Sequence, residues 1–168
     1  MTDLNTELAG TRAAVEDLIS AAERSTANWT ASPAPGKWSP SQIVEHVAMA
    51  LEESAHAASG TPSKFPTLPV FVRPLVRIVF FNRVVKHNAF PKSTAPNALK
   101  PTSGPPTPAD ARIRLERAVT RFNQACVAVA GSGKRITSTI FGAVSVEDFA
   151  RFQAIHTRHH CKQMPGAT

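Results

Sequence analysis

The chain has only two cysteines and lacks any long hydrophobic run. Cys126 and Cys161 match neither a CxxC motif nor a zinc-finger spacing, which argues against a disulfide framework and a cysteine-based zinc module. The most apolar stretch, residues 68–81, is shorter than the roughly 20 residues that a membrane span requires. It is also interrupted by Arg73 and Arg77. We therefore expect no transmembrane segment.

Other signals of location and ligand are also missing. The N-terminal MTDLNTELAG is acidic and polar, unlike a secretory signal peptide, so a reducing cytoplasm is the expected location. GSGK at 131–134 is too short for a phosphate-binding loop and follows a helical pattern rather than a strand. There is no run of five like charges and no internal repeat, so we find no specific nucleic-acid motif.

Length and composition favour one globular domain over residues 1–168, because 42% of the residues are hydrophobic and only 18% are charged. Prolines cluster between residues 33 and 108 and make that part irregular. The formal net charge of +7 favours anionic partners such as nucleic acid, anionic lipid or an acidic small molecule, without choosing among them. A solvated basic surface with no ligand is the competing interpretation.

The first half of the chain contains two predicted helices. Residues 3–30 carry apolar side chains at spacings of three and four, with charges between them. The second helix is predicted over residues 40–58. Ser39 is its N-cap, a proline takes the first helical position, and Gln42 completes a capping box.

Two further helices are predicted in the second half. One begins after Thr107 as N-cap and runs to about Ala130, and the other runs from Ser145 to Gln163. Residues 61–106 form a long Pro-rich connection with a partly helical stretch at 68–90, and the Pro-rich loop at 91–108 is expected to wander over the surface. With no convincing strand, the fold class is all-α. Four helices joined by loops predict an antiparallel four-helix bundle.

The last predicted helix turns two histidines toward the core. His156 and His160 are four residues apart, so about 40° separates them around the helix axis. Phe149 and Phe152 lie within about 40° of His156, whereas most charged residues of this helix fall beyond about 120°. His156 therefore lies near the middle of the stripe that faces the core, where an unpaired imidazole is costly.

The second predicted helix gives a matching result. Ile43, Ala50 and Glu53 lie within about 60° of His46, so His46 points inward. Two helices then turn histidine toward a common interior, and bundle cores are places where metal sites are built from facing helices. Three neutral imidazoles with open positions suit Zn, Ni, Fe or Mn. The predicted ligands of one divalent metal ion are His46, His156 and His160.

Other interpretations stay open. A lone HxxxH pair is a weak signal, and a buried histidine is often simply hydrogen-bonded within the core. His159 lies about 60° from the centre of the face, where we favour a supporting or packing role over ligation. Glu53 and Gln163 are the catalytic candidates. Glu53 could act as an acid or base, whereas Gln163 could orient a ligand or water, or simply end its helix. Cys161 falls on the polar side and is not counted as a ligand.

Two segments resemble the signature segments of the DinB-like superfamily, in a branch of mostly unknown function. They are GKWSPSQIVEHVAMALE at 36–52 and FGAVSVEDFARFQAIHTRHHCKQ at 141–163. The combination of WSPxQIVEH with FG…HTRHHxxQ is fairly specific, and the helix order fits over the whole chain. The resemblance implies an up-down-down-up four-helix bundle with a three-histidine metal site. His46 would be the first ligand, and His156 and His160 the HxxxH pair.

The resemblance also implies a function. Characterised relatives in that superfamily include thiol-dependent S-transferases and a mycothiol-dependent isomerase, in which a metal is thought to activate a low-molecular-weight thiol. We therefore expect a metal-dependent S-transferase or hydrolase with a small-molecule substrate. A non-catalytic metal-binding or stress-associated protein is the alternative.

A third hypothesis is a basic binder of anions or membrane surfaces that uses residues 68–90. A homodimer is compatible with all three hypotheses. Four arginines of the third predicted helix could also bind anions, although a solvated helix face is the favoured interpretation. These are Arg112, Arg114, Arg117 and Arg121.

Overall fold

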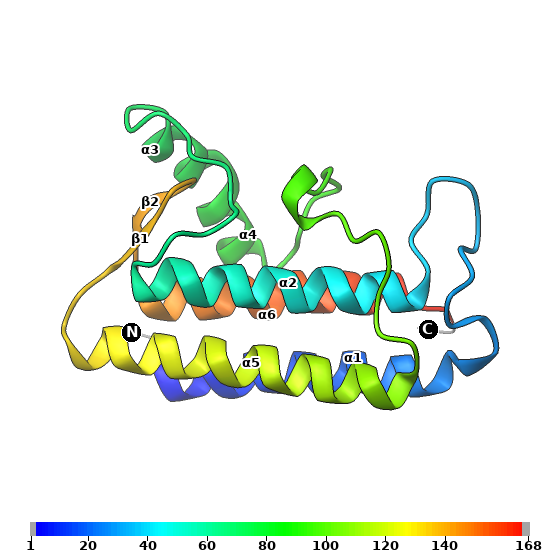
Figure 1. Cartoon of the computed structure of the whole chain (residues 1–168). Coiled ribbons are helices and arrows are strands. Elements are labelled where there is room, and N and C mark those ends of the chain that lie inside the picture. The colour runs from blue at the N-terminus through cyan, green and yellow to red at the C-terminus, as the bar shows by residue number, and fades with distance from the viewer. Residues whose placement is uncertain (1–2, 166–168) are drawn as a thin grey trace.

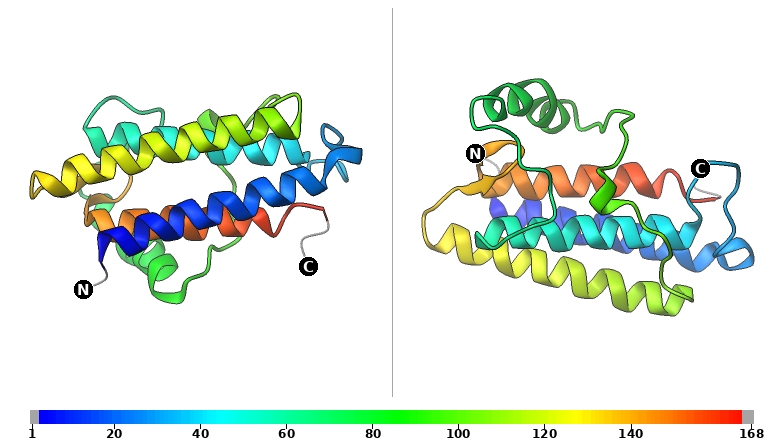
Figure 2. Two further views of the ribbon diagram at one scale, coloured as in Figure 1. Left: turned by 90° about the horizontal axis from the view of Figure 1, so that it is seen from below. Right: turned by 45° about the horizontal axis from the view of Figure 1, so that its top comes forward.

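The computed structural model of the chain describes residues 3–165. Its four long helices are α1 (Leu4–Arg24), α2 (Pro40–Ser59), α5 (Pro108–Gly131) and α6 (Val146–Cys161). They run up, down, down and up along the bundle, with α1 beside α6 and α2 beside α5 (Figures 1 and 2). The predicted fold class, an all-α four-helix bundle, is confirmed.

Short-range hydrogen bonds fix where three of these helices begin. The Ser39 hydroxyl accepts from the backbone N–H of Gln42 at 3.3 Å, and the Ser39 N–H donates to the Gln42 side-chain oxygen at 3.0 Å. Thr107 and Ser145 cap α5 and α6 by accepting from the N–H three residues further on. Each cap satisfies backbone groups that the helix leaves unpaired. The predicted starts are therefore confirmed.

The apolar stripes of the long helices meet in one core. Burying each large apolar side chain contributes about 1.5–3 kcal/mol, so these stripes supply most of the force that closes the bundle. The side chains with no exposed surface include Leu18, Ile19, Val44, Val47, Leu51, Leu115 and Phe122.

The first helix is shorter than the predicted span of residues 3–30. It ends at Arg24, and a 3₁₀ turn, η1 (Thr26–Asn28), follows. The Ser25 hydroxyl donates to a backbone carbonyl one turn earlier at 2.8 Å, which competes with continuation of the helix. Trp29 is buried, and its indole N–H donates to a carbonyl of the Pro-rich connection at 2.8 Å. A tertiary contact therefore places this residue outside the helix.

A short β-hairpin joins α5 to α6. Strands β1 (Ile136–Ser138) and β2 (Gly142–Val144) pair antiparallel, with Ile136 opposite Val144. Gly142 has a φ of 71°, a left-handed conformation that glycine adopts without strain. The expectation of no strands was wrong here, because three-residue strands are too short to show an alternating pattern.

The connection between α2 and α5 carries a helical stretch, as predicted. It consists of α3 (Arg73–Val76), a π-helical turn η2 (Arg77–Phe81) and α4 (Asn82–His87), which follow one another without a break. This stretch lies over the face formed by α2 and α6, on the side away from α1 and α5 (Figure 1). A 3₁₀ turn, η3 (Asn97–Leu99), comes next.

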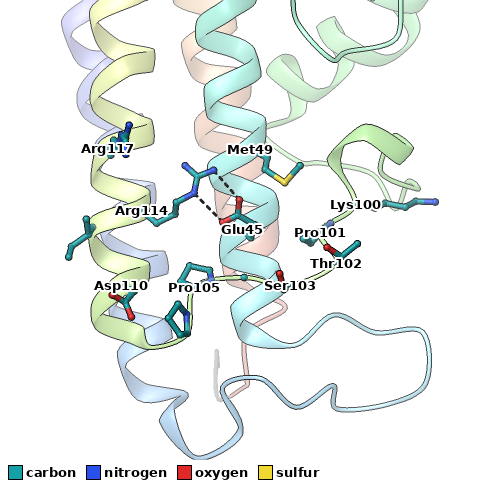
Figure 3. Close-up of a pocket in the computed structure, with 13 residues that line it drawn as sticks. Glu45, Met49, Lys100, Pro101, Thr102, Ser103, Pro105, Asp110, Arg114 and Arg117 are labelled. Atoms are coloured by element: carbon teal, nitrogen blue, oxygen red, sulfur yellow. Dashed lines mark hydrogen bonds and ion pairs between the residues drawn. The ribbon is translucent and has the colours of Figure 1, made fainter.

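The Pro-rich loop after η3 is tied to the bundle and does not wander over the surface. The carbonyl of Pro105 accepts hydrogen bonds from the Trp29 indole and the Ser41 hydroxyl, both at 2.8 Å. Leu99 is buried. Figure 3 shows the loop passing from Lys100 over the start of α2 to the start of α5. These contacts make the loop part of the fold.

Three arginines of α5, Arg112, Arg114 and Arg121, pair with carboxylates of neighbouring helices. Arg114 bonds to both Glu45 and Glu52 of α2 at 2.6–3.1 Å, and Figure 3 shows its contact with Glu45. Arg112 reaches Glu16 of α1 at 3.2 Å. The interpretation of these arginines as a solvated face was therefore wrong for Arg114, which holds α5 against α2 from a partly buried position.

Candidate metal centre

The antiparallel order of α2 and α6 brings the three predicted histidines to the same end of the bundle. His46 lies on α2, less than two turns after its capped start. His156 and His160 lie in the last two turns of α6. Because the two helices run in opposite directions, the first half of α2 lies beside the last half of α6 (Figure 1).

The three imidazole rings meet at one point. Nε2 of His156 lies 3.3 Å from Nε2 of His46 and 3.1 Å from Nε2 of His160. One nitrogen from each ring lies within 4.8 Å of the other two. All three residues are buried, with exposed fractions of 2%, 8% and 7% for His46, His156 and His160. The predicted convergence of imidazoles from two helices is therefore present.

Hydrogen bonds on the far side of two rings determine which nitrogen carries the proton. Nδ1 of His46 lies 2.7 Å from the carbonyl oxygen of Leu99, which can only accept, so Nδ1 donates and Nε2 keeps a lone pair. Nδ1 of His160 lies 3.0 Å from Oε1 of Gln163. The amide oxygen of Gln163 can only accept, so His160 also donates from Nδ1, while the amide nitrogen of Gln163 donates to Nε2 of His159 at 3.0 Å.

These tautomers leave the centre short of hydrogen-bond donors. Lone pairs of His46 and His160 both face His156, whose Nε2 can donate to only one of them. A buried nitrogen without a donor is costly, and a divalent cation would satisfy all three nitrogens at once. Nitrogens that share a tetrahedral ion lie about 3.3 Å apart, close to the 3.3 Å and 3.1 Å that separate Nε2 of His156 from those of His46 and His160. The donor set therefore fits a divalent metal ion, and neutral imidazoles suit Zn, Ni, Fe or Mn.

Two aromatic residues without a predicted role cover the imidazoles. The ring centroid of Trp38 lies 4.7 Å from that of His46 and 6.1 Å from that of His160. The Phe90 ring lies 5.0 Å from His156. Such contacts restrict ring rotation and keep water away. The WSP motif before α2 was a signal for Trp38, whereas nothing in the sequence around Phe90 pointed to the centre.

The histidines line a cavity of about 1160 Å³. Among the described residues that line it, the charged ones are lysines, and neither Asp nor Glu occurs. A mostly apolar cavity with a few polar groups is the usual form of a small-molecule site. The lysines are Lys37, Lys92 and Lys100. The aromatic wall consists of Trp38, Phe65, Phe80, Phe90, Phe141, Phe149 and Phe152.

Two buried polar atoms of the same cavity lack a hydrogen-bond partner. They are the hydroxyl of Ser54 and the amide oxygen of Gln153, whose residues are 0% and 4% exposed. Ser54 lies two turns beyond His46 on α2, and Gln153 lies one turn before His156 on α6. Buried polar atoms are normally paired. Each therefore marks a polar position in the cavity, where a water or a polar group of a ligand would fit.

The two catalytic candidates take different places. Gln163 lines the cavity and holds the His160 ring through the hydrogen bond described above. Glu53 is buried, as its angle to His46 predicted, but its carboxylate accepts from the backbone N–H of Lys64 at 2.6 Å. Glu53 is absent from the residues that line the cavity. The structure thus ties Glu53 to the start of the Pro-rich connection.

Burial keeps the three histidines neutral. It lowers the pKa of His46 despite the opposing hydrogen bond to Leu99. Burial, followed by the charges of His160 and His46, holds the pKa of His156 well below its ordinary value. Burial and the charge of His46 lower the pKa of His160 to about 3. A neutral imidazole is the form that binds a metal.

We expect the metal-free protein to lose stability as the pH falls below about 6.5, the pKa of an unfolded histidine. The folded-state pKa values are lower, so the unfolded chain binds more protons in this range. The free energy of unfolding should fall by about 1.4 kcal/mol per pH unit for each affected histidine. Urea unfolding in the presence of a chelator, between about pH 7 and about pH 5, measures this.

A matched variant isolates the contribution of one imidazole. His156→Leu removes a buried base, so its stability should depend less steeply on pH than that of the natural chain. A stability that stays flat over this pH range in the natural chain would contradict the assignment of neutral buried histidines.

Comparison with known proteins agrees with this geometry. The sequence model of the DinB superfamily matches residues 4–164, a span that contains all four long helices and the three histidines. Searches of curated proteins and of solved structures gave no match. Because the family match covers nearly the whole sequence, the chain belongs to the DinB superfamily.

Proposed function

We propose that the protein is a divalent-metal-dependent enzyme, an S-transferase that uses a low-molecular-weight thiol or a hydrolase. His46, His156 and His160 would hold the ion. When bound, the ion supplies Lewis acidity that lowers the pKa of a thiol or a water in an open position. One observation carries the proposal. The three Nε2 atoms converge at the wall of a ligand-sized cavity and not in a closed core.

The residues around the imidazoles support a preorganised site. The Leu99 carbonyl and the Gln163 amide oxygen each accept a hydrogen bond from an outer ring nitrogen, so both rings are oriented before a metal arrives. Trp38 packs against the same two rings and shields them from water. We assign Gln163 a positioning role through His160. We assign Glu53 the role of anchoring the Pro-rich connection between α2 and α5.

The lining of the cavity favours activation of the nucleophile by the metal. A general base must lie within hydrogen-bond reach of the proton that it removes. No carboxylate lines the cavity among the described residues, so none is placed to act as that base. Lys37, Lys92 and Lys100 would instead attract an anionic thiol or substrate.

The alternative is a metal-binding bundle without catalysis. Structural metal sites are usually closed by four protein ligands, whereas catalytic sites keep an open position. Here three imidazoles adjoin a cavity with aromatic walls and two unpaired polar atoms, which is the arrangement of a site that receives a ligand. This difference favours the enzyme over the purely structural role.

Cobalt substitution tests the proposal. The metal-stripped protein should bind about one Co²⁺ per chain, seen as visible absorption bands of a nitrogen-coordinated ion. Cysteine or 2-mercaptoethanol should then shift these bands and add a near-ultraviolet thiolate-to-cobalt band. Binding of Co²⁺ without any response to either thiol, together with no hydrolysis of ester or amide substrates, would favour the non-catalytic alternative. No Co²⁺ binding at all would overturn the metal site.

A further inference from the structure

The helical stretch of the connection presents apolar side chains to solvent. Of the large apolar residues that are exposed in the described chain, five lie within ten consecutive positions. Single exposed apolar residues are ordinary, but a contiguous group marks an interaction surface. We define these five as the outer face. They are Val70, Phe71, Leu75, Ile78 and Val79, with exposed fractions of 72%, 84%, 61%, 59% and 57%.

The spacing of the outer face is that of one helix side. Leu75, Ile78 and Val79 lie within α3 and η2 at helical intervals of three and four residues, so they share one side of the stretch, and Phe71 lies two residues before α3. The opposite side of the same stretch is already used. Phe81 is buried in the core, while other side chains of that side line the cavity. The stretch is therefore apolar on two sides, although the fold covers only one.

The segment that carries this face also holds the net positive charge of the protein. Residues 54–109 contain seven lysines and arginines and no Asp or Glu. The rest of the chain has twelve basic and twelve acidic residues, so this segment accounts for the entire net charge of +7. Arg83 and Lys86 are exposed and continue the outer face by about two further turns. An uncompensated positive segment with an apolar centre is complementary to a surface that is anionic outside and apolar beneath.

The two arginines inside the stretch are also free of carboxylates. Arg73 donates to the carbonyl of Leu68 at 2.8 Å, and Arg77 donates to the carbonyl of Ala143 at 2.6 Å. Ion pairs in the described chain involve only arginines of α5. The Arg77 bond holds the stretch against the hairpin, and both bonds leave the positive charge of the guanidinium groups unneutralised.

We propose that the outer face docks the protein on a membrane surface that contains anionic lipid. The apolar side chains would enter the boundary between headgroups and acyl chains, with Arg83 and Lys86 at the level of the lipid phosphates. The docking is peripheral, because no helix in the described part of the chain is long and apolar enough to cross a membrane. A second copy is disfavoured as the occupant, since it would bring two unneutralised positive segments together. The inference does not depend on metal binding.

Vesicle co-sedimentation tests this inference. The natural chain should bind phosphatidylcholine vesicles that contain phosphatidylserine, bind poorly to pure phosphatidylcholine, and release as salt rises. The double variant Phe71→Ser with Leu75→Ser should bind at least about tenfold more weakly. Replacing Arg83 or Lys86 by Ala should weaken binding about fivefold each.

A matched control keeps the test specific. Ile113 and Val127 are the other exposed large apolar residues, at 65% and 54%, and both lie on α5. Ile113→Ser with Val127→Ser should therefore bind vesicles as the natural chain does. Because all four positions are exposed, both double variants should keep the natural melting temperature.

Two results would overturn the inference. One is no binding to phosphatidylserine vesicles at low salt. The other is a natural chain that runs as a dimer and becomes a monomer when Phe71 and Leu75 are replaced by Ser, without any vesicle binding. In that case the outer face is an interface between two copies.

Discussion

His156→Ala should abolish stoichiometric metal binding while the bundle stays folded. His156 is the central member of the trio, because its Nε2 lies within 3.3 Å of the Nε2 atoms of both His46 and His160. Losing an outer hydrogen-bond partner of a ligand already costs about 10–100-fold in metal affinity, so losing the ligand itself should cost more than about 100-fold. Elemental analysis should fall from about one ion per chain to near zero.

The control for this experiment is His56→Ala. His56 lies on α2, is exposed, and its ring bonds only to Thr61, so its removal should leave the metal content unchanged. Alanine favours helix, so the circular dichroism of both variants should match that of the natural chain. Unchanged metal content and affinity in His156→Ala would remove the metal assignment from this trio.

A variant of Gln163 tests a residue that orients a metal ligand without binding the metal itself. Gln163→Leu deletes the acceptor at Nδ1 of His160 but leaves all three ligands in place. It should keep about one ion per chain while binding it about 10–100-fold more weakly. Competition with a chelator measures the affinity. An affinity equal to that of the natural chain would show that the hydrogen bond does not orient the ring.

The parts of this fold that the sequence predicted are those governed by short-range rules. Ser39 and Gln42 form the predicted capping box, and the step of 100° per residue correctly turned His46 and His156 inward. The same count also placed Glu53 toward the interior, where it is buried. Helical geometry gives the direction of a side chain, which is why these predictions succeeded.

Features that depend on a long-range contact could not be predicted. The carboxylate of Glu53 accepts from the backbone of Lys64, because the path of the connection determines what lies beside it. The acceptor for His46 is the carbonyl of Leu99, which lies 53 positions away in η3. A leucine at this position carries no sequence signal for that role. The indole N–H of Trp29 donates to the carbonyl of Pro105, 76 positions away, and this contact places Trp29 outside the first helix. Backbone acceptors of this kind have no sequence signature.

Gly104→Ala should be among the most destabilising single substitutions outside the core. A methyl group at this position would overlap the backbone carbonyl of Ser41, at the start of α2. The loop would have to move away from α2, which strains the hydrogen bonds of the Pro105 carbonyl to Trp29 and Ser41. Two such bonds and the steric conflict together amount to about 2–4 kcal/mol in the free energy of unfolding.

Gly131→Ala is the matched control for Gly104→Ala. Gly131 ends α5, and a methyl group added there would meet nothing within 4 Å. Alanine should therefore leave the stability unchanged or raise it by up to about 1 kcal/mol. Urea unfolding of the two variants beside the natural chain measures the difference. Equal stability of all three would show that the loop yields freely and is not held against α2.

The same substitution probes whether the loop belongs to the metal centre. Gly104 lies five residues after Leu99, whose carbonyl fixes the tautomer of His46. If moving the loop draws this carbonyl away, Gly104→Ala should lower Co²⁺ affinity as well as stability, by up to about 100-fold. Loss of stability with unchanged affinity would mean that Leu99 and Gly104 move independently. The Pro-rich loop would then cover the bundle without orienting the imidazole.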